Sequence, residues 1–262
     1  MSLADSIVSR LRSFSVKGKA RLLSPFCPTS GLRMADVFGY TVELDLSDYI
    51  QRSVYMGAYE RLESALVKRH LRCGMTFLDI GANIGYYSLM AAAIGGPSSR
   101  IIAFEPNPTC FCSLRKTIMD NRIRQITLEN LALSDTAGVS ELFLPKQSGN
   151  NTATMVSNHG GSPVSVAAQT LDEYLEAHNI EHVDFVKIDV EGFEPAVISG
   201  AAGSIRSGKI AAILYESSGP WLRRVGTTPE DLYGFLKSLG MRSINEPSKG
   251  VLECGNILAK RF

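Results

Sequence analysis

The sequence predicts an α/β fold with a doubly wound, mostly parallel sheet. From Met75 onward, short apolar segments alternate with longer amphipathic ones, a pattern typical of parallel strands joined by crossover helices. The last two apolar segments are separated only by a polar, turn-rich stretch at residues 246–254. These two segments therefore predict an antiparallel hairpin at one edge of the sheet.

Each element follows from its hydrophobic pattern. Apolar runs predict seven strands, at residues 76–80, 100–105, 126–133, 183–190, 211–217, 242–245 and 255–262. Segments with apolar residues three or four positions apart predict the intervening helices, at residues 86–94, 109–121, 171–179, 195–205 and 229–240.

The chain is expected to form one main domain, residues 57–262, after an N-terminal extension at residues 1–56. The extension contains a predicted basic amphipathic helix over residues 2–23 and a strand at 40–46, and the main domain opens with a helix at 57–71. A basic amphipathic helix can contact a membrane surface or an anionic substrate. Packing on its own domain, or on a second copy in a homo-oligomer, is the preferred interpretation.

A polar segment rich in glycine, serine and asparagine interrupts the alternation at residues 145–165. Loops of this length inside a compact domain are usually functional. We expect a lid over the binding site, with its histidine, His159, as an alternative general base.

The composition argues against several classes of protein. The 262 residues include 27 basic and 26 acidic ones, for a formal net charge of +1, so no strong field favours nucleic acid as a partner. The five cysteines are scattered, which fits a reducing compartment better than a disulfide framework or a zinc site. No segment has the length of a membrane span or the pattern of a signal peptide, and a cytoplasmic location is expected.

The turn after the first strand of the sheet carries Asp79, Gly81, Asn83 and Gly85. The spacing resembles a dinucleotide fingerprint, but Asn83 replaces the middle glycine and Asp79 would repel a phosphate. Both departures suit a ligand with a cationic group and a neutral sugar, such as S-adenosylmethionine. The structural alternative is that Asp79 and Asn83 cap a helix that begins near Ile84.

Residues at the ends of the next two strands extend this site. Glu105 ends the second strand, where an acid can accept hydrogen bonds from both ribose hydroxyls. Asn130 and Ala132 lie in the third strand segment and could border an adenine ring.

A second group of charged residues is predicted at the ends of the fourth and fifth strands. Lys187, Asp189 and Glu191 belong to the fourth and Glu216 to the fifth, so all four are placed to meet an acceptor. Asp189 is the first candidate for the general base, and Lys187 would orient a substrate oxygen or pair with an acid. The alternative for Glu191, or for the nearby Glu194, is to cap the following helix.

Two further assignments stay open at this point. A metal is not favoured, but Asp189 and Glu216 could hold a divalent ion that acidifies a hydroxyl. Trp221 could form the floor of a sugar site, with ordinary packing as the alternative.

Five segments together resemble a known family: FLDIGANIGYYSL, IIAFEPNP, LALSD, TLDEYL and VDFVKIDVEGFEPAVISGA. In this order they are similar to the FkbM-type S-adenosylmethionine-dependent methyltransferases, over about residues 50–245. The resemblance implies a seven-stranded class I methyltransferase fold and methyl transfer, commonly to a hydroxyl of a sugar or polyketide. It also implies that the 79–85 turn holds the methionine end, Glu105 the ribose, and Asn130 and Ala132 the adenine, with Asp189 and Glu191 facing the reaction.

Three functions remain in competition. The first is an O-methyltransferase acting on a glycan or polyketide-type small molecule. The second is a methyltransferase acting on nitrogen, on nucleic acid or on another small acceptor. The third is an NAD-dependent oxidoreductase or a nucleotide-binding protein without turnover, against which Asp79 and Asn83 argue.

Overall fold

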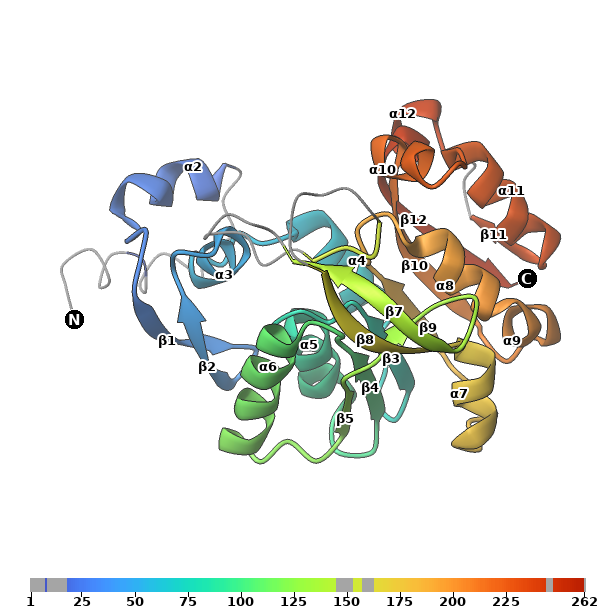
Figure 1. Ribbon diagram of the computed structural model, residues 1–262. Helices are drawn as coiled ribbons and strands as arrows, with labels where there is room; N and C mark the ends of the chain where they lie inside the picture. Colours follow the sequence, from blue (N-terminus) through green and yellow to red (C-terminus); the bar gives the residue numbers. More distant parts are fainter. Residues whose placement is uncertain (1–7, 9–17, 145–152, 157–162, 244–246, 262) are drawn as a thin grey trace.

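The computed structural model describes residue 8 and residues 18–144, 153–156, 163–243 and 247–261. Its main element is a seven-stranded sheet with the strand order β11-β12-β10-β9-β3-β4-β5 (Figure 1). All neighbouring strands are parallel except β12, which is antiparallel to both β10 and β11. The strands are β3 (Thr76–Ile80), β4 (Arg100–Phe104), β5 (Ile126–Glu129), β9 (Phe185–Ile188), β10 (Ala212–Ser218), β11 (Met241–Ser243) and β12 (Cys254–Arg261). The predicted fold class is confirmed.

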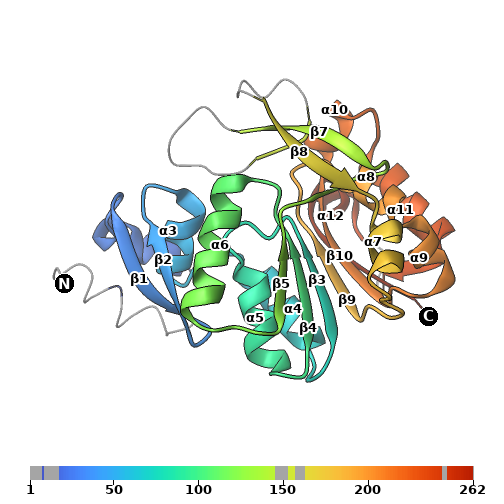
Figure 2. The same cartoon turned by 60° about the horizontal axis from the view of Figure 1, so that its bottom comes forward.

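Helices cover both faces of this sheet (Figures 1 and 2). Because successive side chains of a strand point to opposite faces, Phe77 packs with Leu89 on one face and Leu78 packs with Val197 on the other. The first face is covered by α4 (Arg61–His70), α5 (Tyr86–Gly95) and α6 (Pro108–Asp120). The second is covered by α7 (Leu171–Ala177), α8 (Glu194–Gly200), α9 (Ala202–Ser207) and α11 (Pro229–Ser238).

Local sequence signals fix where two of these helices begin. The Asn107 side chain accepts a hydrogen bond from the Thr109 amide at the start of α6, and Pro108 occupies the first helical position. Thr170 and Glu173 form a capping box at the start of α7. These capping interactions orient the helices that follow β4 and β8.

A second, three-stranded sheet was not predicted. It has the order β6-β8-β7 and consists of β6 (Ala132–Leu133), β7 (Gly138–Phe143) and β8 (Pro163–Gln169). The strand expected over residues 126–133 is therefore divided between two sheets, and between its two parts the Asn130 side-chain amide donates to the backbone carbonyls of Glu105 and Pro106. Figure 2 shows β7 and β8 crossing over one end of the large sheet.

The predicted lid follows β7 and precedes β8. Residues 145–152 and 157–162 of it, including His159, lie outside the described residues. Of the remainder, Thr154 pairs with Phe143 in an isolated bridge and donates a side-chain hydrogen bond to the Glu191 carbonyl. The role of the segment as a lid stays a prediction.

The N-terminal part adds α2 (Lys19–Leu23), the 3₁₀ helix η1 (Ser24–Phe26), the hairpin of β1 (Leu32–Val37) and β2 (Tyr40–Asp45), and α3 (Tyr49–Tyr55). Strand β2 was predicted, whereas β1 and α3 were not. Buried side chains of the hairpin, such as Val42 and Leu44, share one core with Leu89 of α5. The boundary at residue 56 and the role of the N-terminal helix stay predictions, since most of residues 2–23 lie outside the described part.

The C-terminal part contains the predicted antiparallel pair and two short helices, α10 (Gly219–Arg224) and α12 (Lys249–Glu253). Helix α12 forms where only a turn was expected, and it leads the chain back so that β12 lies between β10 and β11. Within the described residues, no helix is long and apolar enough to cross a membrane. The cytoplasmic location stays a prediction.

Candidate active site

A cavity of about 470 Å³ lies at the carboxyl ends of β3, β4, β9 and β10, within the size range of small-molecule sites. Four parts of the chain line it: the segment 49–60, the turns after β3 and β4, the region around β6, and the tips of β9 and β10. It therefore lies where doubly wound folds bind their ligands.

Gly81 forms the part of this wall that follows β3. Its φ of +82° is a conformation that L side chains rarely adopt, and an added Cβ would collide with the carbonyl oxygen of Asp189. Its amide and that of Ala82 both donate to the Phe104 carbonyl at 3.0 Å. The backbone here can reach a ligand closely because no side chain intervenes.

Gly85 has a different role from Gly81. It also has a positive φ, of +84°, but its missing Cβ makes room for Leu114 of α6, and Gly85 does not line the cavity. It is the N-cap residue of α5 and has no side chain to cap that helix end. Asp79 accepts hydrogen bonds from the hydroxyl and the backbone amide of Ser88 in the first turn of α5, so the capping alternative remains open for Asp79.

Asp79 lies behind the turn. Its side chain is 2% exposed and accepts a hydrogen bond of 2.5 Å from the Ser88 hydroxyl of α5. Burial raises the pKa of Asp79 to about 6, although the Ser88 bond opposes this shift. Asp79 thus fixes α5 to β3, and its predicted contact with the methionine end stays a prediction.

Glu105 connects the turns after β3 and β4. Its carboxylate accepts hydrogen bonds from the amides of Asn83 at 2.6 Å and Asn107 at 2.8 Å. Burial raises the pKa of Glu105 to about 7, against the effect of these two bonds. Asn83, with a φ of +52°, and Glu105 both line the cavity, so the predicted ribose site has a fixed acid beside it.

The predicted adenine residues separate in the structure. Ala132 lines an apolar end of the cavity together with Leu131 and Leu133. Asn130 does not line the cavity, and its amide instead holds the Glu105 and Pro106 carbonyls. Both adenine assignments stay predictions.

Lys187 lies beneath the opposite end of the cavity. It is 1% exposed, and its Nζ lies 3.1 Å from Asp189 Oδ2 and 3.2 Å from Asn256 Oδ1. Burial alone would lower the pKa of Lys187, but the carboxylates of Asp189 and Glu60 raise it. Lys187 is therefore a cation that orients Asp189, which is one of its two predicted roles.

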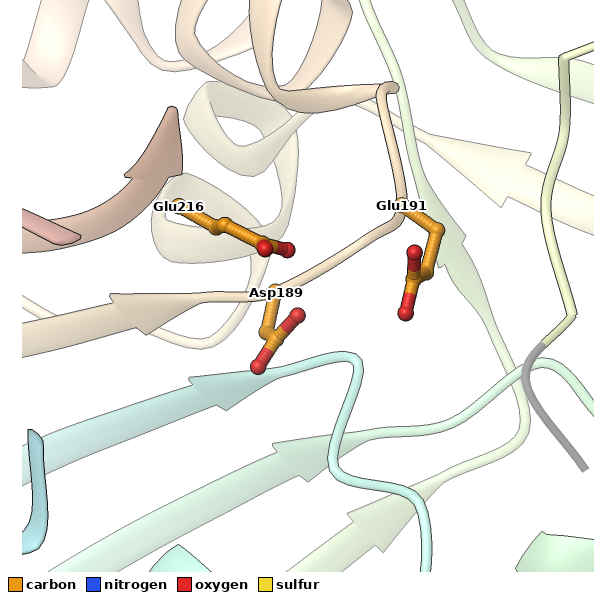
Figure 3. Close-up of side chains that lie close together, drawn as sticks. All are labelled: Asp189, Glu191 and Glu216. Atoms are coloured by element: carbon orange, nitrogen blue, oxygen red, sulfur yellow. The ribbon is translucent and has the colours of Figure 1, made fainter. Parts of the chain in front are cut away.

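Three carboxylates lie close together at the ends of β9 and β10 (Figure 3). Asp189 follows β9, Glu191 lies in the next turn and Glu216 belongs to β10, and one oxygen of each lies within 4.8 Å of the others. Burial, followed by repulsion from Asp189, raises the pKa of Glu191 and of Glu216 to about 8. Such a group can bind a cation or several hydroxyls.

Two neighbouring residues contribute to packing. Glu194 is buried, and its carboxylate accepts from the amides of Val190 and Gly192 in the turn before α8. These bonds hold the turn, and the helix-capping role left open for Glu191 or Glu194 stays a prediction. Trp221 lies on α10 against Gly192, with the Arg224 guanidinium 4.6 Å from its ring centre, and it does not line the cavity. Its predicted contact with a sugar stays a prediction.

The model of the family described as Methyltransferase FkbM domain matches residues 79–243 of this chain. This span begins in β3 and ends in β11. It therefore contains the turns after β3 and β4 with Gly81, Asn83 and Glu105, which we call the cradle. It also contains the acidic group formed by Asp189, Glu191 and Glu216. The chain belongs to the FkbM methyltransferase family.

Individual relatives share less of the chain. The Hexuronic acid methyltransferase AglP of Haloferax volcanii is 30% identical over 129 residues, which are 49% of this chain and 51% of that protein. The 31-O-demethyl-FK506 methyltransferase FkbM of Streptomyces tacrolimicus is 27% identical over 159 residues, 50% of this chain and 60% of that protein. This chain spans between 51% and 60% of the length of the curated relatives it matches.

A solved structure of the same family also aligns. The methyltransferase FkbM from Methylobacillus flagellatus aligns with 98% of this chain and 58% of its own, at 13% sequence identity and a TM-score of 0.46.

The side chains of this FkbM-family cavity fit S-adenosylmethionine better than a dinucleotide. Five carboxylates line it, and the described lining includes no lysine, arginine or histidine. Such a wall offers no cationic partner to a pyrophosphate, and its acids can accept hydrogen bonds from an ammonium group. The apolar end at Ala132 is suited to a base, and Glu105 to a ribose.

The sequence reasoning missed the wall formed by the segment before β3. Tyr49, Ile50 and Ser53 of α3 and the following Ala58, Tyr59 and Glu60 all line the cavity. No periodicity marks these residues as a site, and they reach it only because α3 and α4 pack near α5. The one sequence feature that could have indicated a site here is Glu60, an acid that follows the small and aromatic residues 57–59.

Proposed function

We propose that this FkbM-family protein is an S-adenosylmethionine-dependent O-methyltransferase that methylates a hydroxyl of a sugar, glycan or polyketide-type acceptor. The observation that carries the proposal is that one cavity joins the Gly81–Glu105 cradle to the carboxylates at the tips of β9 and β10. A cationic methyl donor and a polyhydroxy acceptor can therefore meet in a single space.

The cradle would hold the donor through Gly81, Asn83, Glu105 and Ala132. When bound, S-adenosylmethionine supplies an electrophilic methyl group whose sulfur leaves with the bonding electron pair. The protein has to align a hydroxyl oxygen opposite that sulfur, and such alignment can supply up to about 7 to 11 kcal/mol of the barrier reduction.

Asp189 is our candidate for the general base. Its carboxylate lines the cavity, is 23% exposed and is held by Lys187, so it can accept the hydroxyl proton as the oxygen–carbon bond forms. General base catalysis contributes about a hundred- to ten-thousandfold. The raised pKa of Glu191 makes it a poorer base at neutral pH, and the alternative base His159 lies outside the described residues.

Glu191 and Glu216 would bind the acceptor. Both have an oxygen close to Asp189, and adjacent carboxyl groups can hold neighbouring hydroxyls. The names of two relatives, which refer to hexuronic acid and to a 31-O-demethyl compound, support this acceptor class. The same three carboxylates could instead hold a divalent cation, and dependence of turnover on added Mg²⁺ after chelation would favour that alternative.

Calorimetric titration of the purified chain with S-adenosylhomocysteine, and separately with NAD, tests the donor. We expect binding of the first and no heat from the second. Labelled S-adenosylmethionine is then incubated with uronic acids, glycans and polyketide alcohols, and NMR of the product locates the new methyl group. Binding of NAD alone would overturn the proposal, and a methyl group on nitrogen would overturn its O-transfer part.

A further inference from the structure

Glu60 has an unusual backbone for its residue type. It lies immediately before α4, with φ 35° and ψ 56° in the left-handed region. Residues other than glycine, asparagine and aspartate seldom adopt this conformation, and strain of this kind clusters at functional sites. The conformation places Glu60 in the cavity wall beside Ala58 and Tyr59.

The Glu60 carboxylate is held in place by aromatic hydroxyls. The Tyr87 hydroxyl of α5 donates to Glu60 Oε2 at 2.5 Å, and Tyr59 is a second hydrogen-bonding neighbour. A carboxylate has about four acceptor positions. Glu60 therefore retains the capacity to accept further donors from a ligand.

The charges around Glu60 do not balance. Burial, and then repulsion from Asp189, raise the pKa of Glu60, although Lys187 and the tyrosines oppose this. Lys187 is the buried cation of this group, and it faces Glu60, Asp189 and Glu216 together. A positively charged ligand group would relieve the remaining repulsion.

The sheet order places Glu60 at one end of the cradle. Its electrostatic partners are Lys187 in β9 and Asp189 just after it, and Glu105 directly follows β4, with β3 and Gly81 between them. A ligand whose ribose lies at Glu105 and which crosses Gly81 therefore points its other end toward Glu60. In S-adenosylmethionine the group beyond the ribose is the amino acid.

We propose that Glu60 binds the α-ammonium group of S-adenosylmethionine, so that the segment before β3 completes the donor site. This inference rests on the proposed function, because it takes the donor to be S-adenosylmethionine. It assigns a binding residue outside the span that matches the family model, which begins at residue 79.

The test compares two ligands on the full chain. S-adenosylhomocysteine carries the ammonium group, whereas 5′-methylthioadenosine keeps the adenosine and the sulfur but lacks the amino acid. Loss of a charge-assisted bond weakens binding by about 10- to 100-fold. We therefore expect Glu60→Gln to lower the affinity for S-adenosylhomocysteine by this factor in calorimetry. The affinity for 5′-methylthioadenosine should fall by less than about threefold.

Glu63→Gln is the matched control, since Glu63 lies on the same helix and does not line the cavity. It should change neither affinity. If Glu60→Gln does not fold, Tyr87→Phe can replace it, because this change removes the hydroxyl that donates a hydrogen bond to Glu60. It should lower the affinity for S-adenosylhomocysteine by about three- to tenfold and leave the affinity for 5′-methylthioadenosine nearly unchanged.

Three outcomes would contradict the inference in different ways. Equal weakening of both ligands by Glu60→Gln would assign Glu60 a structural role. Unchanged donor binding with a raised KM for the acceptor would place Glu60 on the acceptor side. Failure of the unmodified chain to bind either ligand would instead overturn the proposed function.

Discussion

The two ends of the cavity use carboxylates in opposite ways. At the cradle, Glu105 accepts two backbone amides and Asp79 accepts the Ser88 hydroxyl, so each acid holds the protein together. At the acidic end, no donor among the described residues forms a hydrogen bond to the side chain of Glu191 or Glu216. Carboxylates with protein partners fix a shape, whereas those without partners remain free for a ligand.

This difference predicts how each end responds to substitution. Changes in the cradle should alter affinity and stability together, because the same atoms serve both. Changes at the acidic end should lower turnover or acceptor binding while leaving the fold intact or more stable, as expected where a site holds strain and repulsion.

The largest effect is expected for Asp189→Asn. Loss of the base should lower kcat by about a hundred- to ten-thousandfold, while the affinity for S-adenosylhomocysteine falls far less. Single-turnover assays with calorimetry in parallel measure both quantities. Glu181→Gln, which changes an 86% exposed acid, is the control. Full turnover of Asp189→Asn would contradict the comparison, because it would show that no residue at position 189 is needed as a base.

A pair of glycine substitutions sharpens the description of the cradle. Both Gly81→Ala and Gly85→Ala add a Cβ where the positive φ disfavours one and no room is left for it, so each should cost about 2 to 4 kcal/mol of unfolding free energy. Only Gly81 lines the cavity, and only its substitution should also weaken S-adenosylhomocysteine by at least about tenfold. Urea unfolding and calorimetry distinguish the two, and equal loss of affinity would show that the cradle extends to Gly85.

Glu105→Gln should produce a smaller change in both properties. The amide keeps one acceptor but cannot accept from both Asn83 and Asn107, and the loss of one charge-assisted bond amounts to about 1.5 to 3 kcal/mol. We expect affinity for S-adenosylhomocysteine and the melting temperature to fall together. A large loss of affinity at unchanged stability would mean that Glu105 acts on the ligand alone, against its structural role.

The smallest effect concerns pH. A Glu216 pKa near 8 in the fold, above the ordinary 4.5, means that the folded state binds this proton more tightly than the unfolded state. Its stabilising contribution is complete below about pH 4.5 and is lost as the pH rises through about 8. Glu216→Gln should therefore raise the unfolding free energy at pH 9 and leave it nearly unchanged at pH 5. An equal effect of Glu216→Gln on the unfolding free energy at pH 5 and at pH 9 would show that the carboxylates of the acidic end do not repel one another in the fold.

The sequence by itself determined the fold class, the main cradle and the acidic group. Alternating strand and helix patterns imply a parallel sheet, and the carboxyl ends of parallel strands share one edge. That rule alone brings the 79–85 turn, Glu105, Asp189 and Glu216 to the same end of the molecule. No long-range packing has to be known for this conclusion.

Only the tertiary structure decided which of these residues form the cavity wall and what covers it. Gly81 and Gly85 look alike in the sequence, yet the Asp189 carbonyl lies next to Gly81 and the Leu114 side chain lies next to Gly85. Glu60 reaches the site because α4 and α5 pack on the same face of the sheet, where Tyr87 can bind it. Contacts of this kind join segments that are distant in sequence, so they follow from side-chain packing across the core and leave no periodic pattern in the chain.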